Sequence, residues 1–533
     1  MLFRVILFWI LLLVFGQLSK AQLHDRNWLM GYAGTAGFPW GINQMVFNMD
    51  SFETNLQTWN VGFGKTNACM SDSSGNFLFA SNGAIVINAM GDTMENGDSL
   101  SPCMYTEDFA EYGLDINQGA LSLPYPGHPG WYVLFHEKIP YAIPDQAFEW
   151  NYSLIDMNAN NGLGKVISKN LILVSDTMLA VGNVTAVKHA NGRDWWILKA
   201  TRLSNKLYRV LLSSEGISNL IQVGTSESES HDIRGTSSSW IAFSPDGRRL
   251  AQLLQSGLAA GGIERFLKIV DFDRCDGSFS NSSFLNITNF NSYIGPGSIS
   301  FSPNSSFLYL SYIRYLFQFD LEAPDILASM DTVAIFDGTG DPQCINCLRS
   351  FYILQPAPDG KIYCSAANSI TSMHVINHPN VKGDCCDFRQ HAINLPAFYY
   401  CGLPNFPYYR VGPVDGSSCD TLGLDNIFAP DTTDASYVCD SSLLVSNGLK
   451  YPPIVNIYPN PASDWVQVAS NARKGLEYSA CLFSLTGEKV MELALEKMNT
   501  SLDVSLLPNG IYMVEISNKL NQTKVLRKLS VVH

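Results

Sequence analysis

Charge is scarce in this sequence, and positive charge is scarcer than negative charge. Of the 533 residues, 15% are charged, with 34 Lys and Arg against 48 Asp and Glu, so the net charge is −14. Nucleic acids and anionic bilayers recruit clustered Lys and Arg, and this balance argues against both as partners. Hydrophobic residues make up 46% and aromatic residues 12%, which excludes a disordered chain and allows a large core.

Long hydrophobic runs are missing after the N-terminus. Val5 to Phe15 is an unbroken apolar run behind the basic Arg4, and small residues stand at Ser19 and Ala21. These are the parts of a secretory signal peptide, whereas a membrane anchor needs roughly 20 apolar residues. We therefore predict a signal peptide at 1–21, cleavage between Ala21 and Gln22, and no membrane span in the exported product.

Cysteine is too sparse for a small disulfide scaffold, in which it exceeds about 8% of residues. All twelve cysteines follow the predicted cleavage site, and export favours disulfide bonds. The spacing of Cys344 and Cys347, with Cys385 and Cys386 as a second pair, also fits zinc or redox chemistry, and disulfides are the favoured interpretation. The candidate disulfide cysteines are Cys344, Cys347, Cys385, Cys386, Cys419 and Cys439, of which the last two could pair with each other.

Sustained helical periodicity is also missing between Gln22 and Tyr409, where short apolar strands alternate with turns. Ser-Pro-Asp-Gly247, Ser-Pro-Asn-Ser305 and Pro-Asp-Gly360 each separate two apolar strands. Pro presets the turn, Asp or Asn caps it, and Gly takes the left-handed conformation. With three degenerate copies upstream, the turn positions are Gly75, Gly130, Gly192, Gly247, Ser305 and Gly360, at steps of 55, 62, 55, 58 and 55.

Repeats of this length with about four strands each are typical of propeller blades. We predict an all-β fold: a six- or seven-bladed β-propeller over 22–410, with the strand at 28–32 completing the last blade. A pair of β-sandwiches is the alternative. The hairpin phrase resembles WD40-like repeats, and segments such as Tyr152–Met157 and Asp271–Cys275 are similar to secreted propellers of Bacteroidetes. That resemblance implies fold and export, but no reaction.

A second domain is expected at 453–533, behind a turn-rich, acidic linker at 411–452. Its short alternating strands between Pro, Asn and Gly turns predict a small Ig-like antiparallel sandwich. The order of its motifs resembles the type A sorting domain of the type IX (Por) secretion system; an Ig-like stalk is the alternative. The motif residues are Tyr458, Pro459, Asn460, Pro461, Gly487, Pro508, Gly510, Tyr512 and Lys528.

The resemblance to sorting domains implies partners and a destination. It implies passage across the outer membrane by the type IX machinery and removal of the domain by a sortase-like surface protease. The product would then be released or attached at the outer face of the outer membrane.

Familiar catalytic signatures are missing, including the G-x-S-x-G elbow, the H-E-x-x-H helix and the Walker loop. Weaker patterns are present, but each also fits an ordinary structural role as a turn, a core aromatic or a polar pair in a loop. They are a calcium-like loop at 271–277, an Asp-box-like turn at 71–75, sugar-stacking aromatics at Trp195, Trp196, 398–400 and Tyr408–Tyr409, and acid–base pairs in loops at His136–Glu137 and His231–Asp232.

The sequence therefore favours a surface or secreted propeller that binds a glycan, peptide or protein without catalysis, through loops around its central channel. The alternative is an extracellular hydrolase or lyase acting on polysaccharide or peptide at that channel, because fold does not fix function. A structural role in gliding or surface layers is a third hypothesis. No cofactor, metal or catalytic residue is assigned.

Overall fold

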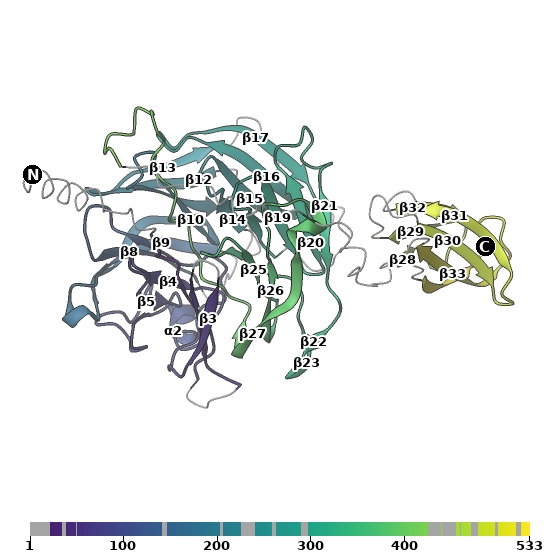
Figure 1. Cartoon of the computed structure of the whole chain (residues 1–533), viewed down its shortest axis with the longest axis horizontal. Helices are drawn as coiled ribbons and strands as arrows, with labels where there is room; N and C mark the ends of the chain where they lie inside the picture. Colours follow the sequence, from purple (N-terminus) through teal and green to yellow (C-terminus); the bar gives the residue numbers. More distant parts are fainter. Residues whose placement is uncertain are drawn as a thin grey trace, which may run out of the picture. The chain divides into compact units, whose positions relative to one another are not determined.

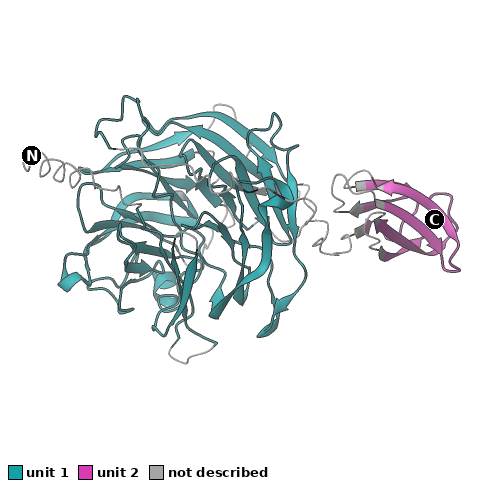
Figure 2. Cartoon of the chain, viewed as in Figure 1, with its two compact units in different colours: residues 1–438 teal, residues 439–533 magenta. Residues whose placement is uncertain are grey.

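The computed structural model of the chain describes residues 22–34, 39–48, 51–140, 146–202, 206–224, 240–257, 263–288, 297–424, 437, 439, 455–458, 460–470, 478–495, 499–518 and 524–533. The chain divides into two compact units, Met1–Val438 and Cys439–His533, which Figure 2 colours teal and magenta. The predicted signal segment, Ala21 included, lies outside the described residues. Within them the protein is nearly all β, as predicted, with one short α-helix, α2 (Met104–Asp108), and two 3-10 turns at Asn160–Gly162 and Gly383–Cys386.

Unit 1 is a series of small antiparallel sheets in which each strand pairs with the next strand of the chain (Figure 1). The strands, sheet by sheet, are β1 (Asn27–Gly31), β2 (Ile42–Phe47) and β3 (Phe52–Gln57); β4 (Ala68–Ser71), β5 (Phe77–Ser81) and β6 (Val86–Asn88); β7 (Leu121–Pro124), β8 (Trp131–Lys138), β9 (Gln146–Asp156), β10 (Lys165–Lys188), β11 (Trp195–Thr201), β12 (Lys206–Ser213) and β13 (Gly216–Gly224); β14 (Trp240–Phe243), β15 (Arg249–Gly257), β16 (Ile263–Phe272) and β17 (Phe279–Asn286); β18 (Ile299–Phe301), β19 (Phe307–Tyr312), β20 (Tyr315–Asp320) and β21 (Asp331–Ile335); β22 (Gly340–Asp341) and β23 (Cys344–Leu348); and β24 (Leu354–Pro356), β25 (Ile362–Cys364), β26 (Ser369–Ile376) and β27 (Phe388–Tyr400).

The seven-stranded sheet is two four-stranded groups that share one long strand. The first half of β10 pairs with β9 and its second half pairs with β11. The change of partner occurs near Gly182 and Asn183, both at positive φ (64° and 55°). A Cβ at residue 182 would lie 1.9 Å from the Asn117 carbonyl oxygen, so glycine is the residue that this crossing point accommodates.

The six repeat turns occupy equivalent places in the sheets. Each lies between the first and second strand of a group, and all six residues have positive φ, from 64° at Ser305 to 87° at Gly75. In the three complete copies the Asp, or the Asn of the second copy, accepts a hydrogen bond from a backbone N–H two residues later, as Asp246 does from Arg248 at 3.0 Å. The repeated turn sequence therefore encodes one hairpin corner in each group of strands after the first sheet.

Neighbouring sheets pack face to face through buried apolar side chains. In β1, Trp28 and Met30 pack with residues of the last sheet, such as Tyr363 and Tyr399. Leu29, on the opposite face of the same strand, packs with Cys69 and Ala80 of the β4–β6 sheet. Alternation along one strand thus places the first sheet between the second and the last.

The prediction that the strand at 28–32 completes the last sheet is wrong. That strand is β1, which pairs with β2 from Asn27↔Val46 to Gly31↔Ile42. The last sheet already has four strands of its own, β24 to β27, because 388–400 supplies the final one. The two ends of unit 1 therefore meet by side-chain packing rather than by strand pairing.

Unit 2 has two antiparallel sheets over a shared core. β28 (Val455–Tyr458), β29 (Trp465–Ser470) and β32 (Asn499–Asp503) form one sheet; the other runs β31 (Lys489–Leu495), β30 (Tyr478–Ser484), β33 (Gly510–Asn518) and β34 (Lys524–Val531). Val466, Val468 and Leu502 from the first sheet pack with Leu482, Val514 and Ile516 from the second. This arrangement matches the small sandwich that the alternating strands predict.

Disulfide bonding corrects two sequence-based expectations. Cys419 bonds Cys275, 144 residues away, so its proposed pairing with Cys439 is wrong. Cys386 is a free, buried thiol. Cys344 bonds Cys347, and Cys385 and Cys439 are also disulfide-bonded. A chain-entropy argument assigns about 5 kcal/mol to a 144-residue closure and about 2 kcal/mol to a three-residue one, so only the first contributes strongly to the stability of the fold.

Residues 411–419, at the start of the predicted linker, pack against unit 1. Val411 is buried, the Val414 N–H donates to the Ala190 carbonyl at 2.8 Å, and Cys419 is held by Cys275. Residues 425–436, 438 and 440–452 of that linker lie outside the described residues.

Replacing Gly192 by Ala should lower the free energy of unfolding of unit 1 by more than the strain of a positive φ alone would cause. Gly192 has φ +76°, and a Cβ there would lie 2.8 Å from both Cδ and N of Pro413. Gly162→Ala is the matched control, since Gly162 has φ +87° with nothing within 4 Å and should lose only about 1–2 kcal/mol. Urea unfolding monitored by tryptophan fluorescence measures both; equal losses would contradict the packing argument.

Candidate functional site

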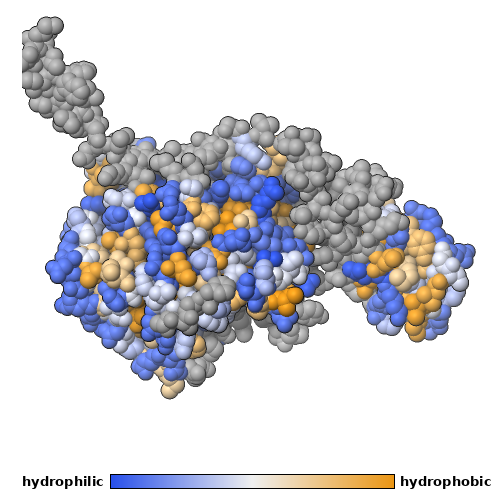
Figure 3. All heavy atoms as spheres, turned by 60° about the horizontal axis from the view of Figure 1, so that its bottom comes forward, coloured by the Kyte–Doolittle hydropathy of each residue, from blue (hydrophilic) through white to orange (hydrophobic). Residues whose placement is uncertain are grey.

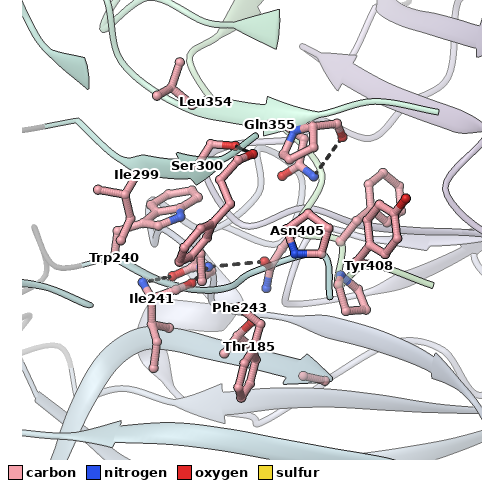
Figure 4. A pocket seen from close by; sticks show the side chains of 18 of the residues that line it. Thr185, Trp240, Ile241, Phe243, Ile299, Ser300, Leu354, Gln355, Asn405 and Tyr408 are labelled. Atoms are coloured by element: carbon pink, nitrogen blue, oxygen red, sulfur yellow. Dashed lines mark hydrogen bonds between the residues drawn. The ribbon is translucent and has the colours of Figure 1, made fainter. Parts of the chain in front are cut away.

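A cavity of ≈60 Å³ lies where the first strands of several groups meet (Figure 4). Its walls come from β10, β14, β18 and β24, and residues 405–408 and 410 of the chain itself close it. Sites for drug-sized ligands are usually about 300–1,000 Å³. The cavity therefore has room for only a few water molecules, not for a sugar or a peptide.

The segment 403–411, which we call the plug, is bonded to several sheets at once. Asn405 donates from Nδ2 to the carbonyls of Ala120 (3.0 Å) and Val184 (3.1 Å), and its backbone N–H donates to the Asn67 carbonyl at 2.8 Å. Gln118 joins the same network, with Nε2 donating to the Ile241 carbonyl and Oε1 accepting from the Ile241 N–H. Such contacts satisfy strand-end backbone groups that burial would otherwise leave unpaired.

The far end of the plug carries a buried ion pair. Arg410 donates to Asp25 at 2.8 Å, and Asp25 is the only carboxylate in the lining of the cavity. Burial by itself would lower the pKa of Arg410, but Asp25 holds that pKa above its usual range. A charge fixed in this way is a structural partner rather than an acid or base free for catalysis.

A second cluster, which we call the Lys65 patch, lies beside the starts of the first strands; its residues are Lys65, Asp115, Asn117, Tyr352 and Tyr400. Lys65, Asp115 and Tyr352 each precede the first strand of a different group, whereas the glycine turns follow those strands. Lys65 Nζ lies 2.9 Å from Asp115 Oδ1, and 5.9 and 5.8 Å from the ring centroids of Tyr352 and Tyr400. Asn117 Nδ2 donates to the Tyr352 hydroxyl at 3.1 Å.

The Lys65 patch is partly open to solvent and continues into further aromatic side chains. The side chain of Lys65 is 20% exposed and that of Asp115 47%. The Tyr32 hydroxyl bonds Ser369, whose strand neighbour is Tyr400, and the ring of Tyr32 lies 5.2 Å from that of Trp40, which is 42% exposed. These residues form a surface with aromatic faces and polar tips, the combination that suits ligands with both apolar and hydroxyl-bearing surfaces.

Protonation states in the Lys65 patch are fixed near neutral pH. Burial disfavours the charged amine of Lys65, but Tyr352 and Asp115 outweigh it and raise the pKa of Lys65. Burial raises the pKa of Tyr352, and raises that of Tyr400 to about 12. Near neutral pH the patch therefore presents an ammonium at Lys65 and neutral hydroxyls at Tyr352 and Tyr400.

The sequence analysis missed most of this patch. Of its aromatic residues only Tyr400 belonged to a predicted cluster; its neighbours Phe398 and Tyr399 are buried. Lys65, Asp115 and Tyr352 share no motif, because they come from separate repeats. Their common position just before a first strand is the one signal that could have grouped them.

The predicted acid–base pair His136–Glu137 is not in a loop. Both residues lie on β8, where they are 1% and 2% exposed. Glu137 pairs with Lys199 and accepts the Gly182 N–H at 2.7 Å. Burial raises the pKa of Glu137 and lowers that of Lys199, and each partner opposes the effect of burial on the other. The pair fixes β8 against the crossing point of β10 and lies away from solvent.

The other candidate residues from the sequence either have a structural role, in the core or in a turn, or lie outside the described residues. Trp195 and Trp196 are 1% and 3% exposed, so they fill the core. Asp273 and Asp276 cap backbone N–H groups of their own turn, and Asp72 does the same at Ser74 and Asn76. No group of three or more His, Cys, Asp or Glu side chains is placed to hold a metal within the described ranges. His231 and Asp232 lie outside them.

The predicted mature N-terminus is packed beside a buried lysine. Lys188 Nζ donates to Gln22 Oε1 at 2.5 Å. Burial, together with the nearby charges of Arg274 and Arg410, lowers the pKa of Lys188 to about 7. The next residues, His24 and Asp25, are 6% and 3% exposed, so the start of the described chain is part of the core of unit 1.

In unit 2 several of the predicted motif residues converge on the last strand. Asn460 donates from Nδ2 to the Lys528 carbonyl at 2.8 Å and accepts the Ser530 N–H at 2.9 Å. Tyr512 is buried and donates to the Pro508 carbonyl at 2.8 Å. Gly487 turns the β30–β31 hairpin at φ +84°. Tyr458 lies on β28, Pro461 and Gly510 are described nearby, and Pro459 lies outside the described residues.

Comparison with known families identifies unit 2. Residues 456–531 match the secretion system C-terminal sorting domain. The match confirms the sequence-based resemblance and supports export by the type IX secretion system, to a secreted or surface-attached destination. No helix within the described ranges has the length and apolar character that a membrane crossing requires. No curated protein matches the chain significantly.

Similarity to solved structures is weak. A functionally unknown protein from Desulfotomaculum acetoxidans is 15% identical, with 72% of this chain and 99% of that chain covered and a TM-score of 0.40. A provisional 6-phosphogluconolactonase from Bacteroides fragilis is 11% identical, with 71% of this chain and 98% of that chain covered and a TM-score of 0.41. PorZ, a surface component of the type IX secretion system of Porphyromonas gingivalis, is 10% identical, with 92% of this chain and 69% of that chain covered and a TM-score of 0.25. TM-scores this low carry no argument about this chain.

Acid should destabilise unit 1 partly through His136. This ring is bonded to Ser101 and Ser153 on its two nitrogens, and burial lowers its pKa to about 3. In the unfolded chain it protonates near pH 6.5, so the folded state loses about 1.4 kcal/mol per pH unit as pH falls from 6.5 towards 3. In His136→Gln this part of the slope should disappear from urea unfolding between pH 6.5 and 4. His128→Gln, at an exposed histidine, should keep the slope; a loss there too would contradict the assignment.

Asn460→Ala should impair export. The substitution removes the two side-chain hydrogen bonds that Asn460 makes to β34, at a cost of about 1–3 kcal/mol. We expect a smaller fraction of the protein in the culture medium or at the cell surface, measured by immunoblotting of cell fractions. Ser463→Ala, an exposed change three residues away, is the control and should export normally. Normal export of Asn460→Ala would show that these bonds are dispensable.

Proposed function

We propose that residues 22–424 form a seven-bladed β-propeller of the WD40-like type. Seven groups of strands support this count: the sheets that begin at β1, β4, β14, β18 and β24, and the two groups within the sheet from β7 to β13. The shared cores that link the first sheet to both the second and the last support closure of the ring. The six turns support a common blade design, in which the first sheet is the divergent member.

The propeller binds a carbohydrate without catalysis, and the Lys65 patch is its binding surface. The observation that carries this proposal is the position of the patch: partly exposed Tyr, Lys and Asp side chains from several blades meet beside the starts of the first strands, and the rings of Tyr32 and Trp40 extend this surface. Aromatic faces suit the apolar faces of sugar rings, and amide, amine and carboxylate groups suit their hydroxyls. Figure 3 shows apolar side chains interspersed with hydrophilic ones on the face drawn.

The hydrolase alternative has less support. A glycosidase needs two carboxyl groups flanking the scissile bond, whereas the cavity closed by the plug has one carboxylate, which is paired with Arg410. In the Lys65 patch the single carboxylate, Asp115, is paired with Lys65. Delivery by the type IX system to the outside of the cell would place such a binding surface where extracellular polysaccharide is found.

Substitutions in the patch should weaken glycan binding without changing the fold. For the purified chain without its predicted signal peptide, residues 22–533, Tyr400→Ala in the patch and Trp40→Ala beside it should each raise the Kd about fivefold, since an aromatic contact is worth about 1 kcal/mol. A polysaccharide array first identifies a glycan that the protein binds, and calorimetry then measures its Kd. A reducing-end assay on the same glycan detects any cleavage.

Trp465→Ala is the matched control, because Trp465 is 50% exposed in unit 2. It should bind as the unsubstituted protein does. Unchanged affinity in both patch variants would remove the Lys65 patch from consideration. Release of shortened glycan would favour the hydrolase instead.

A further inference from the structure

The hairpin β22–β23 carries a disulfide at its tip that the proposed function does not use. Gly340 pairs with Leu348 and Asp341 with Cys344, and Cys344 bonds Cys347 three residues on. Ile345, between the two cysteines, is 82% exposed, and Leu348 is 43% exposed. In Figure 1 the hairpin lies at the lower edge of unit 1. Cys344 and Cys347 are partly buried, and Cys347 also contacts the core, so the disulfide is partly open to another molecule.

The hairpin is attached to the fold by contacts that do not involve sulfur. Asp341 Oδ2 accepts from the Thr371 N–H at 2.7 Å and from its hydroxyl at 2.9 Å. The Leu348 carbonyl accepts from Asn368 Nδ2 at 2.9 Å, and the Arg349 N–H donates to the Thr339 carbonyl at 3.2 Å. Opening the disulfide would therefore leave the base of the hairpin in place.

Of the six free cysteines described, five are buried and one, Cys103, is partly exposed. Cys69, Cys364, Cys386 and Cys401 are buried, and burial raises the pKa of each to about 12, which suppresses the reactive thiolate. The Cys275–Cys419 disulfide closes 144 residues and anchors the segment that follows the plug. Strained or exposed disulfides are the labile, regulatory or catalytic ones in general. Cys344–Cys347 joins two partly exposed cysteines on either side of the exposed Ile345 and closes a loop of only three residues.

We propose that Cys344–Cys347 is a thiol–disulfide exchange site that accepts electrons from an external dithiol. A thiolate of the dithiol attacks one hairpin sulfur, forms a mixed disulfide and releases the other cysteine as a thiolate, which takes up a proton. The second thiol of the partner, once deprotonated, attacks the mixed disulfide. The hairpin is thereby reduced to two thiols and the partner is oxidised to a disulfide. The exposed Ile345 gives an approaching partner an apolar contact between the two sulfurs.

Native-state reduction tests this inference. The full exported chain is incubated with increasing dithiothreitol, alkylated without denaturant, and mapped by peptide mass spectrometry. We expect Cys344 and Cys347 to be labelled at least tenfold faster than Cys275 and Cys419, while the thermal unfolding transition of the protein is retained. Equal rates, or labelling only together with unfolding, would overturn the proposal.

A transfer assay with a dithiol peptide supplies the second readout. The oxidised protein should convert about one equivalent of the peptide to its disulfide. The double variant Cys344→Ser with Cys347→Ser should lose this conversion. Cys103→Ser, which removes a free thiol elsewhere in unit 1, should retain it. Conversion that persists in the double variant, or that is lost in Cys103→Ser, would place the chemistry at other cysteines and overturn the proposal.

Discussion

The bonding of the plug to the starts of the first strands is the constraint on which the rest of unit 1 depends. A single side chain, Asn405, satisfies the carbonyl of Ala120, just before β7, and that of Val184, within β10. Buried backbone groups without partners are costly, so separate sheets can converge only if something supplies these bonds. In this protein the chain supplies them itself, after its last sheet is complete.

This constraint decides where function can reside. Because the plug occupies the place where the first strands meet, the space left there is a partly open cavity of ≈60 Å³, and a second pocket of ≈230 Å³ lies beside residues 411–415. The accessible chemistry is displaced to the ends and edges of the sheets. The Lys65 patch lies at one end of the first strands, and the disulfide hairpin β22–β23 extends from the edge. The two sites are chemically separate, one aromatic and hydroxyl-rich and the other a pair of sulfurs.

Export and architecture are connected through the same region. The plug leads into residues 411–419, which Cys275–Cys419 and the Val414–Ala190 bond hold against unit 1. Unit 2, which carries the sorting signal, begins beyond them. Removal of a sorting domain from beyond this anchor would leave the plug and its bonds intact. The 144-residue closure is therefore placed where it protects the working unit.

The amino-acid sequence by itself determined the local features: the strand periodicity, the six hairpin corners with their positive φ, and the motifs of the sorting domain. These depend on residues close together in the chain, such as Pro-Asp-Gly247 or Asn460-Pro461. Tertiary structure decided the partner of β1, the pairing of Cys419 with Cys275, the burial of His136 and Glu137, and the assembly of the Lys65 patch. Each of these joins residues tens to hundreds of positions apart, and no local propensity encodes which distant groups will satisfy one another's hydrogen bonds and fill one another's packing.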